Sequence, residues 1–299
     1  MAKDHYIPQS LLRRFVDHDK GRNLNVLDKL SGKMLHPAVK DFGSIKDFHT
    51  LSNDMRTEFQ GEDLPNIETI LNLKFEDPAA PLFERVVENS SLGSLTSDER
   101  QVIIRFVALQ WVRTPGRIFD MRAYLASSFG EEEPARNLRV FGTPSIPDPI
   151  RDVGLLGIPG DTEGLANVLR RAHLALALAP GGLAVVGDNP VIALSDRELP
   201  DYLYAAFLVS APGSDAFLPI SPRHILYLHT PPDAITGTCG KTLPTPLELS
   251  IDAMNYLNGF QGKNAVRYVV LPRKDQIATL EVEIAKQQAL RFNFKRAFD

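Results

Sequence analysis

Hydrophobic residues recur at helical spacing through much of the first half of the chain. Near the N-terminus, Leu11, Leu12 and Phe15 fall on one face of a helix, and Pro8 suits its first turn because no N–H is needed there. His5 lies just before this predicted helix. Because the free N–H groups at a helix start favour an anion or a neutral imidazole, His5 is a candidate functional residue.

Two further helical stretches carry start signals. Residues 62–89 show a helical period that Asp77-Pro78 is expected to interrupt, with Asp77 as the N-cap of a second helix. The next helix opens with a capping box, in which the side chains of Thr96 and Glu99 each accept from the other's backbone N–H. These signals predict three successive helices.

The inward face of the helix after Thr96 changes from apolar to polar along its length. Ile103, Phe106 and Val107 define the apolar stripe. The same rotation brings Gln110, Thr114 and Arg117 onto that face, with Arg113 at its edge. A buried amide or guanidinium needs partners, because an unpaired one costs about 1–3 kcal/mol. This face is therefore either a satisfied core network or the wall of a site, and the pattern does not decide between them.

Short apolar runs predict strands, mainly in the second half of the chain. Residues 24–27 and 34–36 flank a Ser-Gly turn and predict a β-hairpin. The second half also contains helical stretches, one of them opened by a second capping-box pattern at Thr245 and Glu248. The other expected elements are strands at 183–186, 191–194, 217–222, 225–228 and 266–271, and helices at 165–179 and 276–299.

A segment rich in glycine, proline and charge, residues 130–161, separates the two halves and is interpreted as a long loop. The pattern predicts an α+β fold. A helical N-terminal half with a small β-hairpin packs on a mixed α/β C-terminal half with an antiparallel sheet. We expect one domain over 1–299, with 130–161 as a candidate boundary between 1–129 and 162–299.

Composition narrows the class of protein. With 43% hydrophobic and 23% charged residues, the 299-residue chain is typical of a soluble globular protein. The net charge of −4 gives no general electrostatic reason for binding nucleic acid or an anionic membrane. The single cysteine, Cys239, excludes an internal disulfide and a CxxC-type zinc site, and is expected to be a packed residue. Without a signal-peptide pattern or a membrane-spanning run, a cytoplasmic location and no membrane partner are expected.

Several catalytic motifs do not occur in the sequence. It contains no HExxH, no Walker-type phosphate loop, no GxGxxG after a predicted strand and no GxSxG elbow. Most nucleotide-binding, nicotinamide-dependent and serine-hydrolase interpretations therefore lose support.

Short motifs with a fixed order extend over nearly the whole chain. They are His5-Tyr6-Ile7-Pro8-Gln9, Leu12-Arg13-Arg14-Phe15, Ile67-Glu68, Glu76, Leu109-Gln110-Trp111-Val112-Arg113-Thr114-Pro115, Asp188-Asn189-Pro190, Pro219-Ile220-Ser221-Pro222 and Asn255. Together they resemble the bacterial DUF4238 family. That family has no assigned function, so the resemblance implies a shared pattern of residues and no mechanism. One departure is Gly187, which stands where the family more often has serine.

In a first hypothesis, the residues that the resemblance groups together converge in one pocket of an enzyme. The reaction is hydrolysis, and a phosphodiester or another anionic group is the expected target. A small anionic ligand or a nucleic acid is then the expected partner, and a divalent metal ion is a candidate cofactor. The candidate catalytic or metal-binding residues are His5, Glu76 and Asp188, and the candidate substrate-binding residues are Tyr6, Gln110, Arg113 and Asn189.

In a second hypothesis, the same residues form a buried polar network that locks the N-terminal helix onto the core. His5 and Tyr6 then tie down the chain end by packing and hydrogen bonds. Such a network specifies one arrangement when every member is satisfied. The protein would in that case bind a ligand or a partner at its surface without chemistry.

Overall fold

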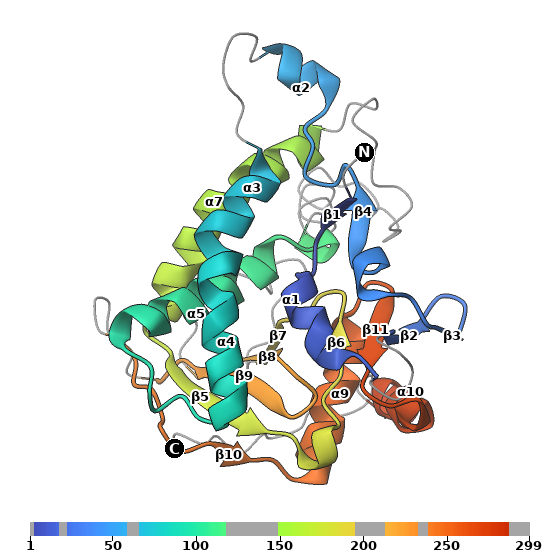
Figure 1. Cartoon of the computed structure of the whole chain (residues 1–299), viewed down its shortest axis with the longest axis vertical. Helices are drawn as coiled ribbons and strands as arrows, with labels where there is room; N and C mark the ends of the chain where they lie inside the picture. Colours follow the sequence, from blue (N-terminus) through green and yellow to red (C-terminus); the bar gives the residue numbers. More distant parts are fainter. Residues whose placement is uncertain are drawn as a thin grey trace.

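Helices of the first 169 residues stand over a sheet from the rest of the chain (Figure 1). The computed structural model describes residues 3–17, 23–58, 66–117, 149–194, 213–232 and 239–286. The predicted α+β class is confirmed, with helices concentrated in the N-terminal half and sheets in the C-terminal half. None of the helices in the described ranges is long and apolar enough to cross a lipid bilayer.

The N-terminal residues form a strand and a short helix. β1 (Lys3–His5) pairs antiparallel with β4 (Ser44–Lys46). α1 (Gln9–Leu12) follows with Pro8 as its N-cap, and a 3-10 turn (Arg13–Phe15) extends it. The predicted amphipathic helix is confirmed, and its apolar side chains are buried in the core.

One continuous helical rod consists of α3 (Ile67–Leu71), a π-helical segment (Asn72–Glu76) and α4 (Asp77–Asn89). The predicted break at Asp77-Pro78 is therefore wrong. A proline ring inside an α-helix clashes with the carbonyl group four residues earlier. Here that carbonyl lies in the wider π turn, which lets the helix continue through Pro78.

α5 (Ser97–Val112) has the predicted start. The backbone N–H of Glu99 donates to Thr96 Oγ1 at 3.2 Å, and the backbone N–H of Thr96 donates to Glu99 Oε2 at 2.8 Å. The predicted polar end of the inward face is also confirmed, because Gln110 and Arg113 are both buried. The helix ends three residues before Pro115, in keeping with the restriction that proline places on its predecessor.

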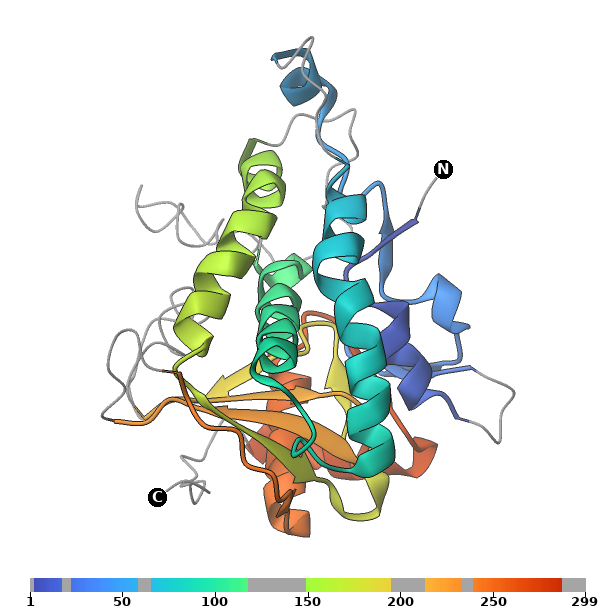
Figure 2. The same ribbon diagram turned by 60° about the vertical axis from the view of Figure 1, so that its left-hand side comes forward.

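A five-stranded sheet lies under these helices. Its order is β10-β5-β9-β8-β7, antiparallel except for the parallel β10–β5 pair. Successive side chains point to opposite faces, and both faces are buried, one under the helices and one under α9 (Ile251–Asn264) (Figure 2). The strands are β5 (His173–Leu178), β7 (Ile192–Leu194), β8 (Asp215–Pro219), β9 (His224–His229) and β10 (Leu247–Glu248).

α7 (Pro149–Leu169) corrects two predictions. The predicted loop over 130–161 is wrong from Pro149 onward, and residues 130–148 lie outside the described ranges. Packing along α5 outweighs the low helix propensity of the glycines and proline in α7. The predicted helix over 165–179 is wrong beyond Leu169, because β5 follows. Both faces of β5 are buried, so its apolar run lacks the alternation that marks a strand.

A second, four-stranded antiparallel sheet contains strands from both halves of the chain. The predicted hairpin is confirmed as β2 (Asn25–Asp28) and β3 (Lys33–Leu35). β2 also pairs with β11 (Tyr268–Leu271), and β11 pairs on its other side with β6 (Val186–Gly187). The predicted strand pair around Asp188 is thus divided, because β6 and β7 join different sheets. A single domain over the whole chain stays a prediction.

α9 (Ile251–Asn264) covers the lower face of the five-stranded sheet. Its N-cap is Ser250, whose Oγ accepts from the backbone N–H of Ala253 at 3.1 Å. The predicted capping box at Thr245 is therefore wrong, because Glu248 lies in β10. Parallel pairing with β5 outweighs the local helix-start pattern there.

Two helices and one thiol complete the described fold. α2 (Asn53–Glu58) precedes the helical rod, and α10 (Ile277–Lys286) is the predicted terminal helix as far as it is described. Cys239 is free and exposed, so its predicted packing is wrong.

We expect Thr96→Ala to lower the free energy of unfolding by about 1 kcal/mol, because the N–H of Glu99 loses its acceptor at the start of α5. Urea unfolding followed by circular dichroism measures the difference. Ser94→Ala, at an exposed position two residues earlier, is the matched control. Equal stability of the two variants would contradict a stabilising role for this capping box.

Candidate functional site

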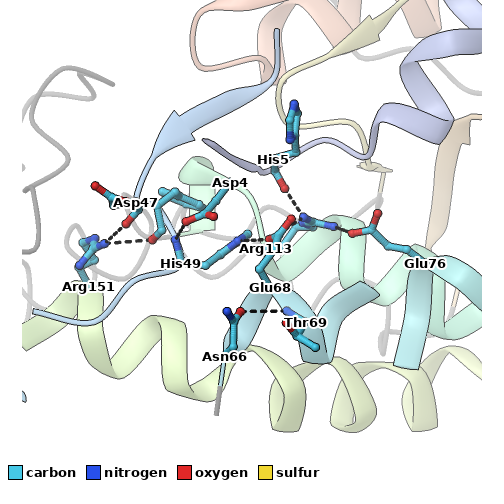
Figure 3. A network of polar contacts seen from close by, with 11 residues as sticks. Asp4, His5, Asp47, His49, Asn66, Glu68, Thr69, Glu76, Arg113 and Arg151 are labelled. Atoms are coloured by element: carbon cyan, nitrogen blue, oxygen red, sulfur yellow. Dashed lines mark hydrogen bonds and ion pairs between the residues drawn. The ribbon is translucent and has the colours of Figure 1, made fainter. Parts of the chain in front are cut away.

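The side chain of Arg113 is buried just beyond the C-terminal end of α5, where it holds three other segments (Figure 3). Its Nη1 donates to the carboxylate of Glu76, and its Nη2 donates to the backbone carbonyl oxygen of His5. Nη2 also lies 3.8 Å from Oε2 of Glu68. One guanidinium therefore ties β1, α3 and the π-helical segment to α5. We call Arg113 with these three partners the Arg113 network.

The π-helical segment brings the two glutamates of this network to one side of the rod. An α-helix turns about 100° per residue, so eight residues of regular helix would leave Glu68 and Glu76 about 80° apart. A π turn contains more residues and rotates less per residue. Five residues of π-helix, Asn72–Glu76, therefore return Glu76 towards the direction of Glu68, and both carboxylates reach the same guanidinium.

His49 and Asp4 extend the Arg113 network. Nδ1 of His49 is hydrogen-bonded to Oε2 of Glu68, the same oxygen that faces Arg113. The backbone N–H of His49 donates to Oδ2 of Asp4 at 2.8 Å. One ligand atom from each of Asp4, His49 and Glu68 lies within 4.8 Å of the others. Ligand atoms lie about 2.0–2.2 Å from a zinc-like ion, so small side-chain shifts would bring these three atoms onto one ion.

Burial and charge shift the protonation of this group. Burial lowers the pKa of His49 and therefore favours its neutral imidazole, although Glu68 opposes that effect. Burial likewise raises the pKa of Asp4. For Glu68, burial works against ionisation, but the hydrogen bond from His49 and the charge of Arg113 outweigh it and lower its pKa. Glu68 is thus the favoured carboxylate anion of the group.

His5 joins the Arg113 network through its backbone. Figure 3 shows its carbonyl oxygen pointing at Arg113 and its imidazole ring pointing away from it. The ring Nε2 lies 3.3 Å from the side-chain Nε2 of Gln9. The imidazole is only partly buried. The contacts of His5 therefore anchor β1 to α5 and leave the ring at the margin of the network.

Tyr6 and Gln110 are buried near these residues. The Tyr6 ring packs edge-on against Phe48 with a centroid separation of 6.1 Å, and burial followed by the charge of Asp188 raises the pKa of its phenol. Gln110 is fully buried one turn before Arg113, and neither its Oε1 nor its Nε2 has a hydrogen-bond partner among the described residues.

Asp188 forms a separate centre at the end of β6. Its carboxylate accepts from the backbone N–H groups of Val266, Arg267 and Tyr268 at 2.6, 2.8 and 2.9 Å. Burial nevertheless raises the pKa of Asp188 to about 6. The hydrogen bonds that its side chain makes in the described part of the chain all go to the start of β11. The arrangement is the cap of a chain reversal.

Asn189 connects this corner to the end of α5. Its Oδ1 accepts from the hydroxyl of Thr114 at 3.1 Å. Its backbone carbonyl oxygen accepts from the side chain of Asn264 at 2.9 Å. The described contacts thus bring Glu76, Arg113 and the His5 backbone together directly, and they link Asn189 to the same end of α5 through Thr114.

The sequence reasoning did not select Asp4, His49 or Glu68 as site residues. Glu68 entered it only as a member of a motif and His49 only as an anchor in irregular structure. A usable signal was present, because Asp4 adjoins His5 and Glu68 stands eight residues before Glu76. Their convergence depends on contacts between β1, the turn after β4 and α3, which no local pattern records.

A family described as "Protein of unknown function (DUF4238)" matches residues 3–275. The chain belongs to this family. The resemblance drawn from the motifs is therefore confirmed, and the match includes every residue of the Arg113 network and of the Asp188 corner. No curated protein and no solved structure matches the chain. The family description names no activity, so the chemistry of the DUF4238 fold must be argued from these residues.

We expect the stability difference between the wild type and Asp188→Asn to depend on pH. Because the native pKa of Asp188 is raised from 3.8 to about 6, the native state holds this proton more tightly than the unfolded state. The resulting stabilisation is present below pH 4 and is lost as the pH rises through 6. The stability advantage of the wild type over Asp188→Asn, measured as the free energy of unfolding in urea titrations, should therefore fall by about 3 kcal/mol between pH 4 and pH 7.

Asp28→Asn is the control of opposite sign. The hydrogen bond from Arg267 lowers the pKa of Asp28 to about 2, so its stabilisation is present above pH 4 and is lost as the pH falls towards 2. The difference in free energy of unfolding between the wild type and Asp28→Asn should stay constant between pH 4 and pH 7. A constant difference for Asp188→Asn would contradict the raised pKa.

Proposed function

We propose that this DUF4238 protein is a hydrolase that acts on an anionic substrate, such as a phosphodiester, beside the Arg113 network. One observation carries the proposal. The imidazole of His49 is held by the carboxylate of Glu68, next to the buried guanidinium of Arg113. A carboxylate that orients an imidazole is the arrangement by which hydrolases position a general base.

The exposure of the side chains indicates where a substrate would approach. The side chains of His49 and Arg113 are 1% and 0% exposed, whereas those of Glu68 and Glu76 are 25% and 13% exposed. Arg113 therefore acts through its charge and by holding the two glutamates in place. The groups that reach solvent are carboxylates, so an anionic substrate needs a cation between itself and the protein.

We expect the purified protein to release p-nitrophenol from bis(p-nitrophenyl) phosphate in the presence of Mn²⁺. His49→Gln and Glu68→Gln should each reduce kcat by about 100-fold or more, because general acid–base groups contribute about 10²–10⁴-fold. Their melting temperatures, compared with that of the wild type, separate loss of chemistry from loss of the fold.

His36→Gln is the matched control, because His36 is exposed and has no place in the site. It should keep the wild-type rate. Absence of turnover with this diester and with p-nitrophenyl phosphate would overturn the proposal for phosphate esters. Equal turnover by the wild type and His49→Gln would overturn the role of the His49–Glu68 pair.

A specific observation also favours a second candidate function, a protein that binds a ligand or partner without chemistry. Both terminal nitrogens of Arg113 are engaged, and the Asp188 carboxylate accepts three backbone N–H groups. Side chains that several partners hold in this way support a structural network. In this candidate the function lies on the surface and the network only positions β1.

The two candidates differ in the expected stability of Glu68→Gln. In a structural network, removing this carboxylate takes a shared partner from His49 and Arg113 and lowers the free energy of unfolding by about 1–3 kcal/mol. At a catalytic site, the change removes a partly exposed reactive group and costs little stability or increases it. Urea unfolding measures the effect, and Glu88→Gln, at an exposed position of α4, is the control.

A further inference from the structure

Three separate segments deliver metal-binding side chains to one point beside Arg113. Asp4 comes from β1, His49 from the turn after β4, and Glu68 from the first turn of α3. Their nearest ligand atoms are all within 4.8 Å of one another. Two ligands on opposite sides of a zinc-like ion are about 4 Å apart, so small side-chain shifts would place all three on one ion.

The charges around this point are unbalanced. The carboxylates of Glu68 and Glu76 share the guanidinium of Arg113, and the carboxylate of Asp4 lies beside His49 and Glu68. Three carboxylates thus gather in a largely buried region around one guanidinium. Buried charge without compensation is costly, and either protons or a bound cation must supply the balance. A dication supplies it without protonating the ligands.

His49 provides an independent sign that a ligand binds here. The residue is only 5% exposed, and its Nε2 has no hydrogen-bond partner among the described residues. A neutral imidazole has one lone pair, so the ring offers an ion a single nitrogen. While Nδ1 keeps its proton for Glu68, that nitrogen is Nε2; when the ion replaces this proton, Nδ1 and the carboxylate of Glu68 bind it together.

We infer that Asp4, His49 and Glu68 bind a divalent transition-metal ion of the manganese-to-zinc series. Imidazole together with carboxylates suits these ions, whereas Mg²⁺ and Ca²⁺ prefer ligand sets made of oxygen alone. The partly exposed Glu68 gives the ion and its remaining water ligands a path to solvent. An ion on His49 would occupy the lone pair that a general base needs, and a water bound to the ion would then supply the nucleophile in its place. Only this catalytic role of the ion rests on the proposed hydrolase function, and its binding does not.

Isothermal titration calorimetry of the EDTA-treated, full-length protein tests the site directly. We expect one Zn²⁺ or Mn²⁺ per chain, and no heat of binding from Mg²⁺ at the same concentration. Glu68→Gln and Asp4→Asn, which keep the shapes of the side chains, and His49→Ala should each weaken Zn²⁺ binding by at least about 100-fold. His36→Ala, which removes an exposed histidine, should bind as the wild type does.

Circular dichroism and melting temperature identify any variant that fails to fold. The variants that do fold then test the site. Absence of Zn²⁺ and Mn²⁺ binding by the folded wild type would overturn the inference. Unchanged binding by folded Glu68→Gln and Asp4→Asn would overturn it too. Ion binding without hydrolysis supports the metal site and contradicts the hydrolase. Hydrolysis by a protein that binds no ion supports the hydrolase and contradicts the metal site.

Discussion

The burial of Arg113 is the constraint on which the N-terminal half depends. A guanidinium cannot lose its charge at any ordinary pH, so its burial requires acceptors and opposite charge nearby. Glu76 and the carbonyl oxygen of His5 accept from its two terminal nitrogens, and Glu68 contributes charge from 3.8 Å. The first strand, the helical rod and α5 must therefore meet at one place. This requirement accounts for the irregular π-helical segment, because the π-helix turns Glu76 towards the guanidinium.

The helix starts and the buried polar face of α5 could be predicted because their causes are local. Thr96 and Glu99 stabilise the start of a helix within one turn, and the regular rotation of that helix carries Gln110 and Arg113 inward. The same reasoning failed for β5, whose apolar run is buried on both faces. It failed for α7 as well, where packing against α5 outweighs unfavourable residues. In both cases the deciding contact lies far away in the sequence.

The residues of the candidate site also differ in how far local sequence patterns could identify them. The sequence identified Glu76, Arg113 and the Asp188 corner as unusual, but it could not show which acidic groups are already satisfied. Asp188 accepts three backbone N–H groups and caps the turn into β11. Glu68 instead shares a single oxygen between an imidazole and a guanidinium and stays partly open to solvent. Saturation by backbone groups marks a structural carboxylate, whereas this sharing marks one that can exchange partners.

The charge balance connects the structural and chemical roles of the Arg113 network. Arg113 neutralises part of the carboxylate charge permanently, and the pKa of Glu68 is lowered so that this group stays ionised beside it. Burial acts on Asp4 in the opposite direction, and it favours the neutral form of His49. A neutral imidazole and an ionised carboxylate are the protonation states that metal ligands require. Burial thus keeps His49 in its metal-binding form, whereas the hydrogen bond from His49 and the charge of Arg113 keep Glu68 in its own form against the effect of burial.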